Sequence, residues 1–180
     1  AILEFQQLRV SRRLARTIRS HRFALTCNRD FAGVMMGCGT AGHRVGHTWI
    51  TPDMLQAYLR LHRHRLAHSV EAWQDNQLVG GIYGVAVGAI FSAESMFFRA
   101  RDASKVALVA LVRHLQSRGF ETLDIQQLTP HTASMGASEI SREHYLSRVR
   151  AGRDLPVTFG EELEFDPTAQ QPTAHLGPNA

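Results

Sequence analysis

A carboxylate and an amide two residues apart, Asp124 and Gln126, are the first groups that suggest chemistry. Residues 122–127 alternate as a β-strand does, which sends Leu123 and Ile125 to one face and the polar pair to the other, about 6.5–7 Å apart. The strand follows the most apolar helix of the chain, so we expect it in the centre of the sheet. There the pair would need a partner or a ligand. The alternative is a sheet face exposed to water, as antiparallel sheets often have.

A second acidic group, Glu94, stands in the mainly apolar stretch 91–98. A carboxylate is costly to bury unless it is paired. We therefore expect Glu94 either to have a polar partner or to lie at a strand end in water, and its spacing alone does not decide between the two.

The helices that would position these groups have clear start signals. Thr51 as N-cap and Pro52 at the first helical position predict a helix to about Leu66. Its expected apolar stripe is Leu55, Tyr58, Leu59 and Leu66. Asp102 is expected to cap an almost wholly apolar helix at 106–115, which Gly119 ends. Further helices are expected over 11–20, where arginines recur at helical spacing, and after the N-cap Ser141, where Ile140 and Tyr145 are placed to form a hydrophobic staple.

The strands are expected around a hairpin with the turn Asp75-Asn76. They cover 68–74, 78–87, 89–93 and 122–127. Three strands, a buried helix and a further strand predict a mixed α/β fold, with the helix packed across a mixed sheet.

The charge is divided unevenly along the chain. Residues 1–153 hold all 20 Lys and Arg against 11 Asp and Glu, a net +9, whereas residues 154–180 carry −5. A basic body suits a polyanion partner or, equally, a solvated face. We expect an Arg-rich segment at 1–30 with a short helix, a main domain at 31–165 and a disordered tail at 166–180.

Several motifs are expected to carry no chemistry. Residues 37–42 read GxGxxG, but no helix signal or acid follows at the usual place, which favours a loop. His62, His64 and His68 lie among arginines and lack an evident further ligand, so we predict a solvated basic patch and no metal site. Two cysteines form no disulfide framework, which favours a reduced, cytoplasmic setting.

Several ordered motifs together resemble one family, the bacterial leucyl/phenylalanyl-tRNA–protein transferases, from about residue 9 to 165. These are GHTWIT at 46–51, HSVEAW at 68–73, LVGGIYGV at 78–85, AESMF at 93–97, ASKVAL at 103–108, DIQ at 124–126 and HTAS at 131–134.

This resemblance implies a fold like that of GCN5-related acetyltransferases and no cofactor. It implies transfer of Leu or Phe, and less readily Met, from aminoacyl-tRNA to proteins that begin with Arg or Lys, which marks them for degradation. It also implies a further N-terminal portion upstream of the matched region, which helps to form the tRNA site.

The resemblance also assigns residues. Trp49 would stack on the terminal adenosine, and Glu94, Asp124 and Gln126 would surround the reacting groups. Ser134 of the HTAS motif would contact substrate. The pocket for the amino-acid side chain would be lined by Ile82, Phe91, Ala93, Leu108, Leu111 and Leu123. The tRNA backbone would be contacted by Arg12, Arg13, Arg16 and Arg19.

The implied reaction is aminolysis of an ester that is already activated, so it needs no ATP. An α-amine has a pKa near 7.7–8.0, so a useful fraction is neutral without a strong base. A neutral amide is a weak base. We therefore expect Gln126 to accept a hydrogen bond from the amine and orient it, with Asp124 fixing Gln126 and Glu94 holding the acceptor's amine or cationic first residue.

Two other functions remain open from the sequence. An acetyl-CoA-dependent N-acetyltransferase would need a Gly-rich pyrophosphate loop, but residues 99–104 contain no glycine. A non-catalytic tRNA- or protein-binding relative would not need Glu94, Asp124 and Gln126 together.

Overall fold

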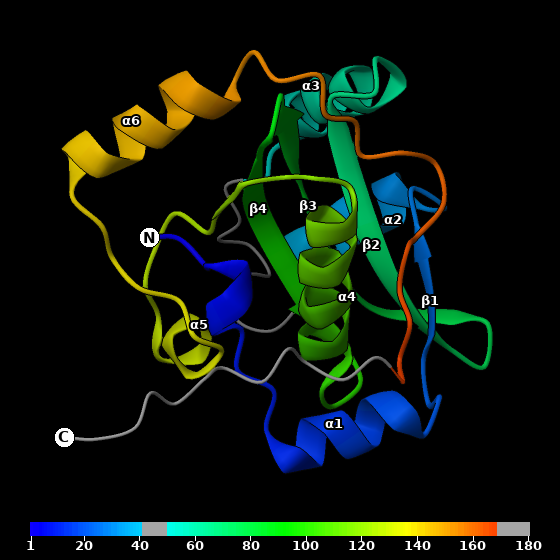
Figure 1. Ribbon diagram of the computed structural model, residues 1–180. Helices are drawn as coiled ribbons and strands as arrows, with labels where there is room; N and C mark the ends of the chain where they lie inside the picture. The colour runs from blue at the N-terminus through cyan, green and yellow to red at the C-terminus, as the bar shows by residue number, and fades with distance from the viewer. Residues whose placement is uncertain (41–49, 169–180) are drawn as a thin grey trace, which may run out of the picture.

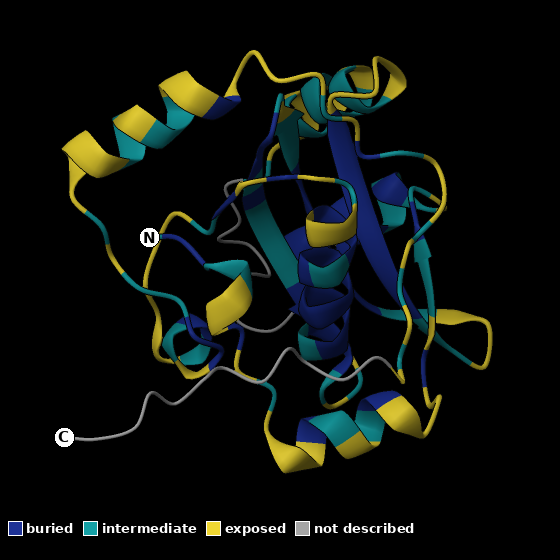
Figure 2. Cartoon of the chain, viewed as in Figure 1, coloured by how far each residue is buried: buried dark blue, intermediate teal, exposed yellow. Residues whose placement is uncertain are grey.

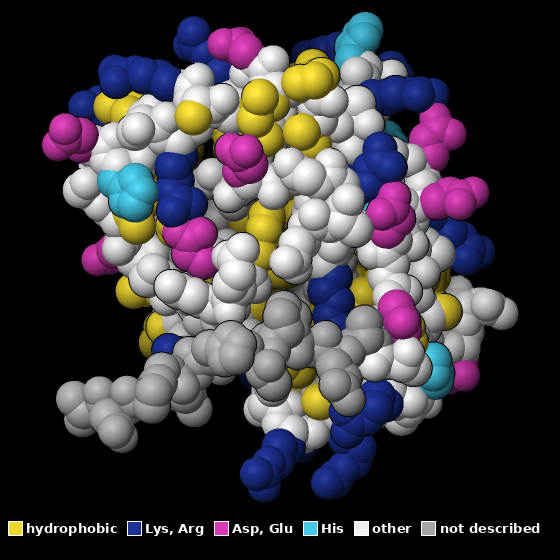
Figure 3. All heavy atoms as spheres, in the orientation of Figure 1, with side chains coloured by type: hydrophobic (Ala, Val, Ile, Leu, Met, Phe, Trp, Pro, Cys, Tyr) yellow, Lys and Arg dark blue, Asp and Glu magenta, His cyan; other side chains and the backbone are white. Residues whose placement is uncertain are grey.

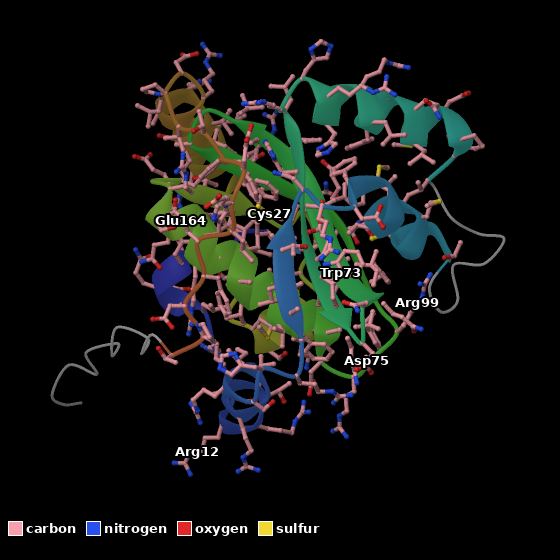
Figure 4. All side chains as sticks on the ribbon, turned by 90° about the vertical axis from the view of Figure 1, so that its right-hand side faces the viewer. Arg12, Cys27, Trp73, Asp75, Arg99 and Glu164 are labelled. Atoms are coloured by element: carbon pink, nitrogen blue, oxygen red, sulfur yellow. The ribbon has the colours of Figure 1, made fainter. Side chains whose placement is uncertain are left out.

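The computed structural model describes residues 1–40 and 50–168, which form helices on both faces of a sheet (Figure 1). The buried helix α4 (Ala103–Ser117) covers one face. Helices α2 (Phe31–Thr40) and α3 (Pro52–Arg63) cover the other, as the view turned by 90° shows (Figure 4). The expected mixed α/β class is confirmed.

The sheet of the described residues has five strands in the order β1-β2-β3-β4-β5. Neighbours are antiparallel from β1 to β4, whereas β4 and β5 are parallel. A parallel pair needs a crossover, and α4 supplies it. The strands are β1 (Ala24–Cys27), β2 (Ala67–Gln74), β3 (Gln77–Val87), β4 (Ile90–Phe98) and β5 (Thr122–Asp124).

The expected helix starts are confirmed where hydroxyl side chains cap them. Ser11, Thr51 and Ser141 each accept a hydrogen bond from a backbone N–H of the first turn. They begin α1 (Arg12–Arg19), α3 and α6 (Arg142–Gly152). Two short helices, η1 (Phe5–Gln7) and α5 (Pro130–Ser134), complete the described helices, and none of these is long and apolar enough to cross a bilayer.

Two apolar clusters hold the layers together (Figure 2). One joins α4 to the sheet and to Leu14 and Ile18 of α1. The other joins α2 and α3 to Tyr83 and Phe97 on the opposite face. Helices therefore pack against both faces of the sheet.

The strand at 122–127 differs from the expectation in two ways. It ends at Asp124, because Gln126 has a left-handed backbone with φ 61°, so Asp124 and Gln126 do not share a strand face. It also lies at the end of the strand order rather than in the centre, because the crossover places it beside β4 alone. Its outer edge is bridged by Ile2.

Other expectations were wrong at the level of single residues. Asp102 makes no side-chain cap but pairs with Arg13. Residues 37–40 of the GxGxxG stretch belong to α2, not to a loop, and 41–42 lie outside the described residues. Leu66 follows α3 and is exposed, so it is not part of the apolar stripe of that helix.

The basic patch at 62–68 is also only partly as expected. His68 is 5% exposed and lies in β2, stacked on Phe159 with ring centroids 4.3 Å apart. His62 stacks on Phe31. Burial lowers the pKa of His68 to about 4, so this imidazole is a neutral interior group and not a solvated cation. Within the described residues there is no cluster that could hold a metal ion.

The proposed division into a segment 1–30, a domain 31–165 and a tail 166–180 stays a prediction. Residues 24–27 of the first segment form β1 of the common sheet. The backbone oxygen of Asp166 accepts a hydrogen bond from Arg113. Residues 169–180 of the expected tail lie outside the described residues.

Candidate functional site

Glu94 and Gln126 meet because of the parallel register of β4 and β5. Ser92 is the partner of Asp124 in that register. Glu94 and Gln126 each follow two residues later in the sequence, so they come to lie near each other. The amide nitrogen Nε2 of Gln126 donates to Oε2 of Glu94 over 2.9 Å. Glu94 therefore has the polar partner that its apolar setting required.

Asp124 is held on both carboxylate oxygens. Its Oδ1 accepts the backbone N–H of Gln126 over 2.7 Å, and its Oδ2 accepts the hydroxyl of Tyr145 over 2.8 Å. The first bond closes a tight loop around Gln126, whose left-handed backbone is uncommon for a residue other than glycine. Asp124 thus fixes the main chain of Gln126, whereas Glu94 fixes its side chain.

Tyr58 of α3 reaches the same group of residues. Burial, the charge of Glu94 and a hydrogen bond to Glu94 together raise the pKa of Tyr58 to about 12. Its hydroxyl therefore stays protonated at neutral pH and can donate to the carboxylate. Hydrogen bonds link Glu94, Gln126, Asp124 and Tyr145, and Tyr58 interacts with Glu94, although these residues come from four separate parts of the chain.

A cavity of about 420 Å³ opens beside this network. Its volume lies in the range of roughly 300–1,000 Å³ that is usual for small-ligand sites. Its walls combine apolar and polar side chains. They are formed by Ile82, Ala93, Glu94, Ser95, Met96, Ile125, Gln126, Gln127, Thr129, His131 and Thr132.

Only some of the residues expected to line an amino-acid pocket lie in the wall of this cavity. Ile82 and Ala93 do line the cavity. The others belong to the same apolar cluster but are 0–1% exposed, and their role in a pocket stays a prediction: Phe91, Leu108, Leu111 and Leu123. Ser134 lies on α5, donates to the backbone oxygen of His131 and is not part of the cavity wall. Trp49 lies outside the described residues.

Three residues of the site carried no assignment from the sequence. Tyr58 and Tyr145 had been seen only as apolar helix positions, and nothing in their local pattern reveals a carboxylate partner. His131 lines the cavity, and burial, assisted by the charge of Lys105, lowers the pKa of His131. This imidazole is therefore neutral at neutral pH. Its place in the HTAS motif was the only available signal.

No arginine of the fully described helix α1 lines the cavity. Helix α1 lies at the lower end of the molecule in Figure 1, and basic side chains project from the lower edge of the surface in Figure 3. Arg12, Arg16 and Arg19 are exposed, and Arg12 points away from the body (Figure 4). Arg13 instead makes a two-pronged ion pair with Asp102, in which one nitrogen–oxygen distance is 2.9 Å. Arg13 thereby joins α1 to the start of α4.

A larger cavity, of about 770 Å³, lies between β2, β3 and the segment 157–161. Its lining includes His62, His68 and Phe159 but not Glu94, Asp124 or Gln126. Volume is a weaker indicator of a site than a network of converging polar groups, so the smaller cavity is the candidate site.

The network suits a reaction that needs positioning more than strong acid or base chemistry. The NH₂ of Gln126 is engaged by Glu94, which leaves its Oε1 as the atom able to accept a hydrogen bond from a substrate N–H. The carboxylate of Glu94 attracts a cation, and the apolar wall at Ile82 and Ala93 accommodates a hydrophobic group. An amine and an apolar side chain could therefore be held together here.

The comparisons with known proteins point the same way. The model of the family described as leucyl/phenylalanyl-tRNA protein transferase matches residues 2–150. A leucyl/phenylalanyl-tRNA–protein transferase of Solidesulfovibrio magneticus is 47% identical over 177 residues, covering 96% of this chain and 72% of the relative. Its counterpart in Pseudomonas aeruginosa is 49% identical over 159 residues, covering 88% and 70%.

A third relative of the same name, from Rhodopseudomonas palustris, is 50% identical over 175 residues, covering 91% of this chain and 78% of its own. Among solved structures, a ribosomal-protein-alanine N-acetyltransferase from Brucella melitensis biovar Abortus 2308 is similar over 66% of this chain and 93% of its own. The TM-score is 0.45 and the identity 19%.

Proposed function

The chain belongs to the leucyl/phenylalanyl-tRNA protein transferase family and is an aminoacyltransferase. On this basis we propose its substrates and the residues that bind them and position them for reaction. It transfers Leu or Phe, and less readily Met, from aminoacyl-tRNA to acceptor proteins whose first residue is Arg or Lys. This addition marks the acceptor for degradation. Charged tRNA and acceptors would meet the enzyme in the cytoplasm.

The observation that carries the proposal is the hydrogen bond between Gln126 Nε2 and Glu94 Oε2 at the wall of the 420 Å³ cavity. It fixes the orientation of the amide, with Oε1 as its acceptor. The apolar part of the same wall, at Ile82 and Ala93, suits an unbranched-Cβ side chain such as that of Leu or Phe. Such a pocket discriminates by about 1–3 kcal/mol per methylene.

The reaction then needs few chemical groups. The neutral α-amine of the acceptor attacks the ester carbonyl, a new amide bond forms, and the ester C–O bond breaks. The proton lost by the amine balances the one gained by the ribose hydroxyl of the departing tRNA. Gln126 Oε1 accepts a hydrogen bond from the attacking amine, and Glu94 attracts the cationic first residue. Holding both reactants in place supplies most of the acceleration.

The tRNA is held by contacts that do not read its sequence. We assign Arg12, Arg13, Arg16 and Arg19 to its phosphates and Trp49 to its terminal adenosine. The exposure of Arg12, Arg16 and Arg19 supports this assignment, whereas the ion pair of Arg13 with Asp102 gives that residue a second role. Phosphate contacts make binding sensitive to salt.

A single assay tests the proposed function. The protein is incubated with tRNA charged with labelled Phe and with a peptide that begins with Arg, in the absence of ATP and acetyl-CoA. We expect label to move to the peptide, and a peptide that begins with acetylated Arg serves as the control that must stay unlabelled. Acetylation of the peptide when acetyl-CoA is added instead, or binding of tRNA without turnover, would refute the proposal.

A further inference from the structure

Helix α6 sends one side chain into the site, and nothing in the comparisons assigns it a role. Tyr145, in the first turns of α6, donates its hydroxyl to Oδ2 of Asp124 over 2.8 Å. The other oxygen, Oδ1, accepts the backbone N–H of Gln126 over 2.7 Å. Both oxygens of the carboxylate are thus directed by donors on different elements.

The bond from Tyr145 fixes the carboxylate of Asp124, and this carboxylate in turn holds the backbone of Gln126. A carboxylate held by one donor can rotate about its Cβ–Cγ bond, whereas one held on both oxygens has a fixed plane. That fixed plane keeps Oδ1 under the backbone N–H of Gln126, whose φ of 61° is a conformation that needs support from its surroundings. Burial, a hydrogen bond to Asp124 and the charge of Asp124 raise the pKa of Tyr145 to about 12, so the donor is present throughout the neutral range.

Helix α6 itself is loosely attached, which makes this contact prominent. Figures 1 and 2 show it beside the body with most of its surface exposed, and within this fully described helix Gly152 is the buried residue. It is also held by the ion pair between Arg148 and Glu4, and by the hydrogen bond from the N–H of Ala89 to the backbone oxygen of Gly152. The ion pair holds the same helix without touching Asp124, so it provides a matched comparison.

We propose that Tyr145 is a positioning residue of the aminoacyl transfer: its hydroxyl fixes Asp124, and Asp124 in turn fixes Gln126. This inference rests on the proposed function. Tyr145 touches neither the reacting amine nor the ester. Its loss should therefore slow the chemical step and leave the binding of both substrates nearly unchanged.

The test is the Tyr145→Phe variant in the Phe-transfer assay, with Arg148→Gln as the control that removes another tie of α6. We expect kcat of Tyr145→Phe to fall by about 10-fold, as loss of one hydrogen bond to a charged group implies, with KM for Phe-tRNA and for the peptide changed by less than about 2-fold. We expect Arg148→Gln to keep kcat within about 2-fold of the unmodified protein.

Each other outcome overturns the inference. An equal loss of kcat in both variants would mean that the hydroxyl only anchors α6. An unchanged kcat for Tyr145→Phe would mean that Asp124 needs no second donor. A rise in KM with unchanged kcat would place Tyr145 in substrate binding. If the unmodified protein transferred no Phe, the proposed function itself would be refuted. If the unmodified protein were active and Tyr145→Phe had the same kcat, only the role of Tyr145 would be refuted.

Discussion

At the scale of single residues, the site depends on the two different ways in which Gln126 is held. Asp124 binds its backbone, and Glu94 binds its side chain. The left-handed backbone of Gln126 is disfavoured for residues other than Gly, Asn and Asp, and the bond from its N–H to Asp124 supports it. A substitution can therefore remove the side-chain interaction of Gln126 while its backbone conformation is kept.

The variant Gln126→Asn separates them. Asn accepts the left-handed backbone readily, but its shorter side chain no longer reaches Oε2 of Glu94. We expect a stable protein whose kcat is lowered by about 10-fold or more, measured in the transfer assay beside thermal unfolding. The same substitution at the exposed Gln116 of α4, which is not part of the cavity wall, should change kcat by less than about 2-fold. Equal kcat values for the two variants would contradict the positioning role of Gln126.

At the scale of elements, α1 combines a structural side and a charged side. Leu14 and Ile18 are buried in the core that also contains α4, whereas Arg12, Arg16 and Arg19 face water. Arg13 lies between these sides, because its side chain, 49% exposed, pairs with the 6% exposed side chain of Asp102. The arginines of one helix should therefore differ in what their loss does.

We expect Arg13→Gln to lower the free energy of unfolding by on the order of 1–3 kcal/mol, because it leaves the nearly buried carboxylate of Asp102 without its charged partner. Denaturant unfolding measures this change.

The matched variant Arg16→Gln should leave stability almost unchanged. It should instead reduce the slope of log K for tRNA binding against log salt by about 1, if this side chain contacts one phosphate. A slope equal to that of the unmodified protein would remove Arg16 from the tRNA interface.

At the scale of the whole molecule, neutral histidines fasten the C-terminal segment across the sheet and α4. His68 stacks on Phe159. His114, fully buried, has Nε2 2.7 Å from the backbone oxygen of Phe159 and accepts the N–H of Glu164 on Nδ1. Burial lowers the pKa of both histidines, and the two ring contacts of His114 fit only the neutral form.

Stability should therefore fall in acid. The pKa of His68 is lowered from 6.5 to about 4 in the folded state, so the unfolded chain binds the proton more tightly between these values. The stability that neutral His68 contributes is complete above pH 6.5 and is lost as the pH falls towards 4. By this linkage the difference in unfolding free energy between the unmodified protein and His68→Gln should shrink by on the order of 3 kcal/mol from pH 7 to pH 4. A difference that stays constant with pH would contradict the assignment.

Much of the fold could be predicted from the sequence, because the deciding signals are local. Ser11 precedes the basic helix, and Thr51 and Ser141 cap helices from their own side chains. Asp75-Asn76 forms the hairpin turn with both residues at positive φ. Helix α2 was missed because its glycines weaken the helical pattern, and β1 because its four residues are too few to show alternation.

The sequence by itself determined the residue types of the site and the family, since Glu94, Asp124 and Gln126 stand within motifs that can be read along the chain. Only the tertiary structure decided how these residues meet. The parallel register of β4 and β5 brings Gln126 to Glu94, and the turn after Asp124 replaces the strand that alternation predicted. Tyr58 and Tyr145 join from distant helices, and such contacts depend on packing between elements, which no local spacing encodes.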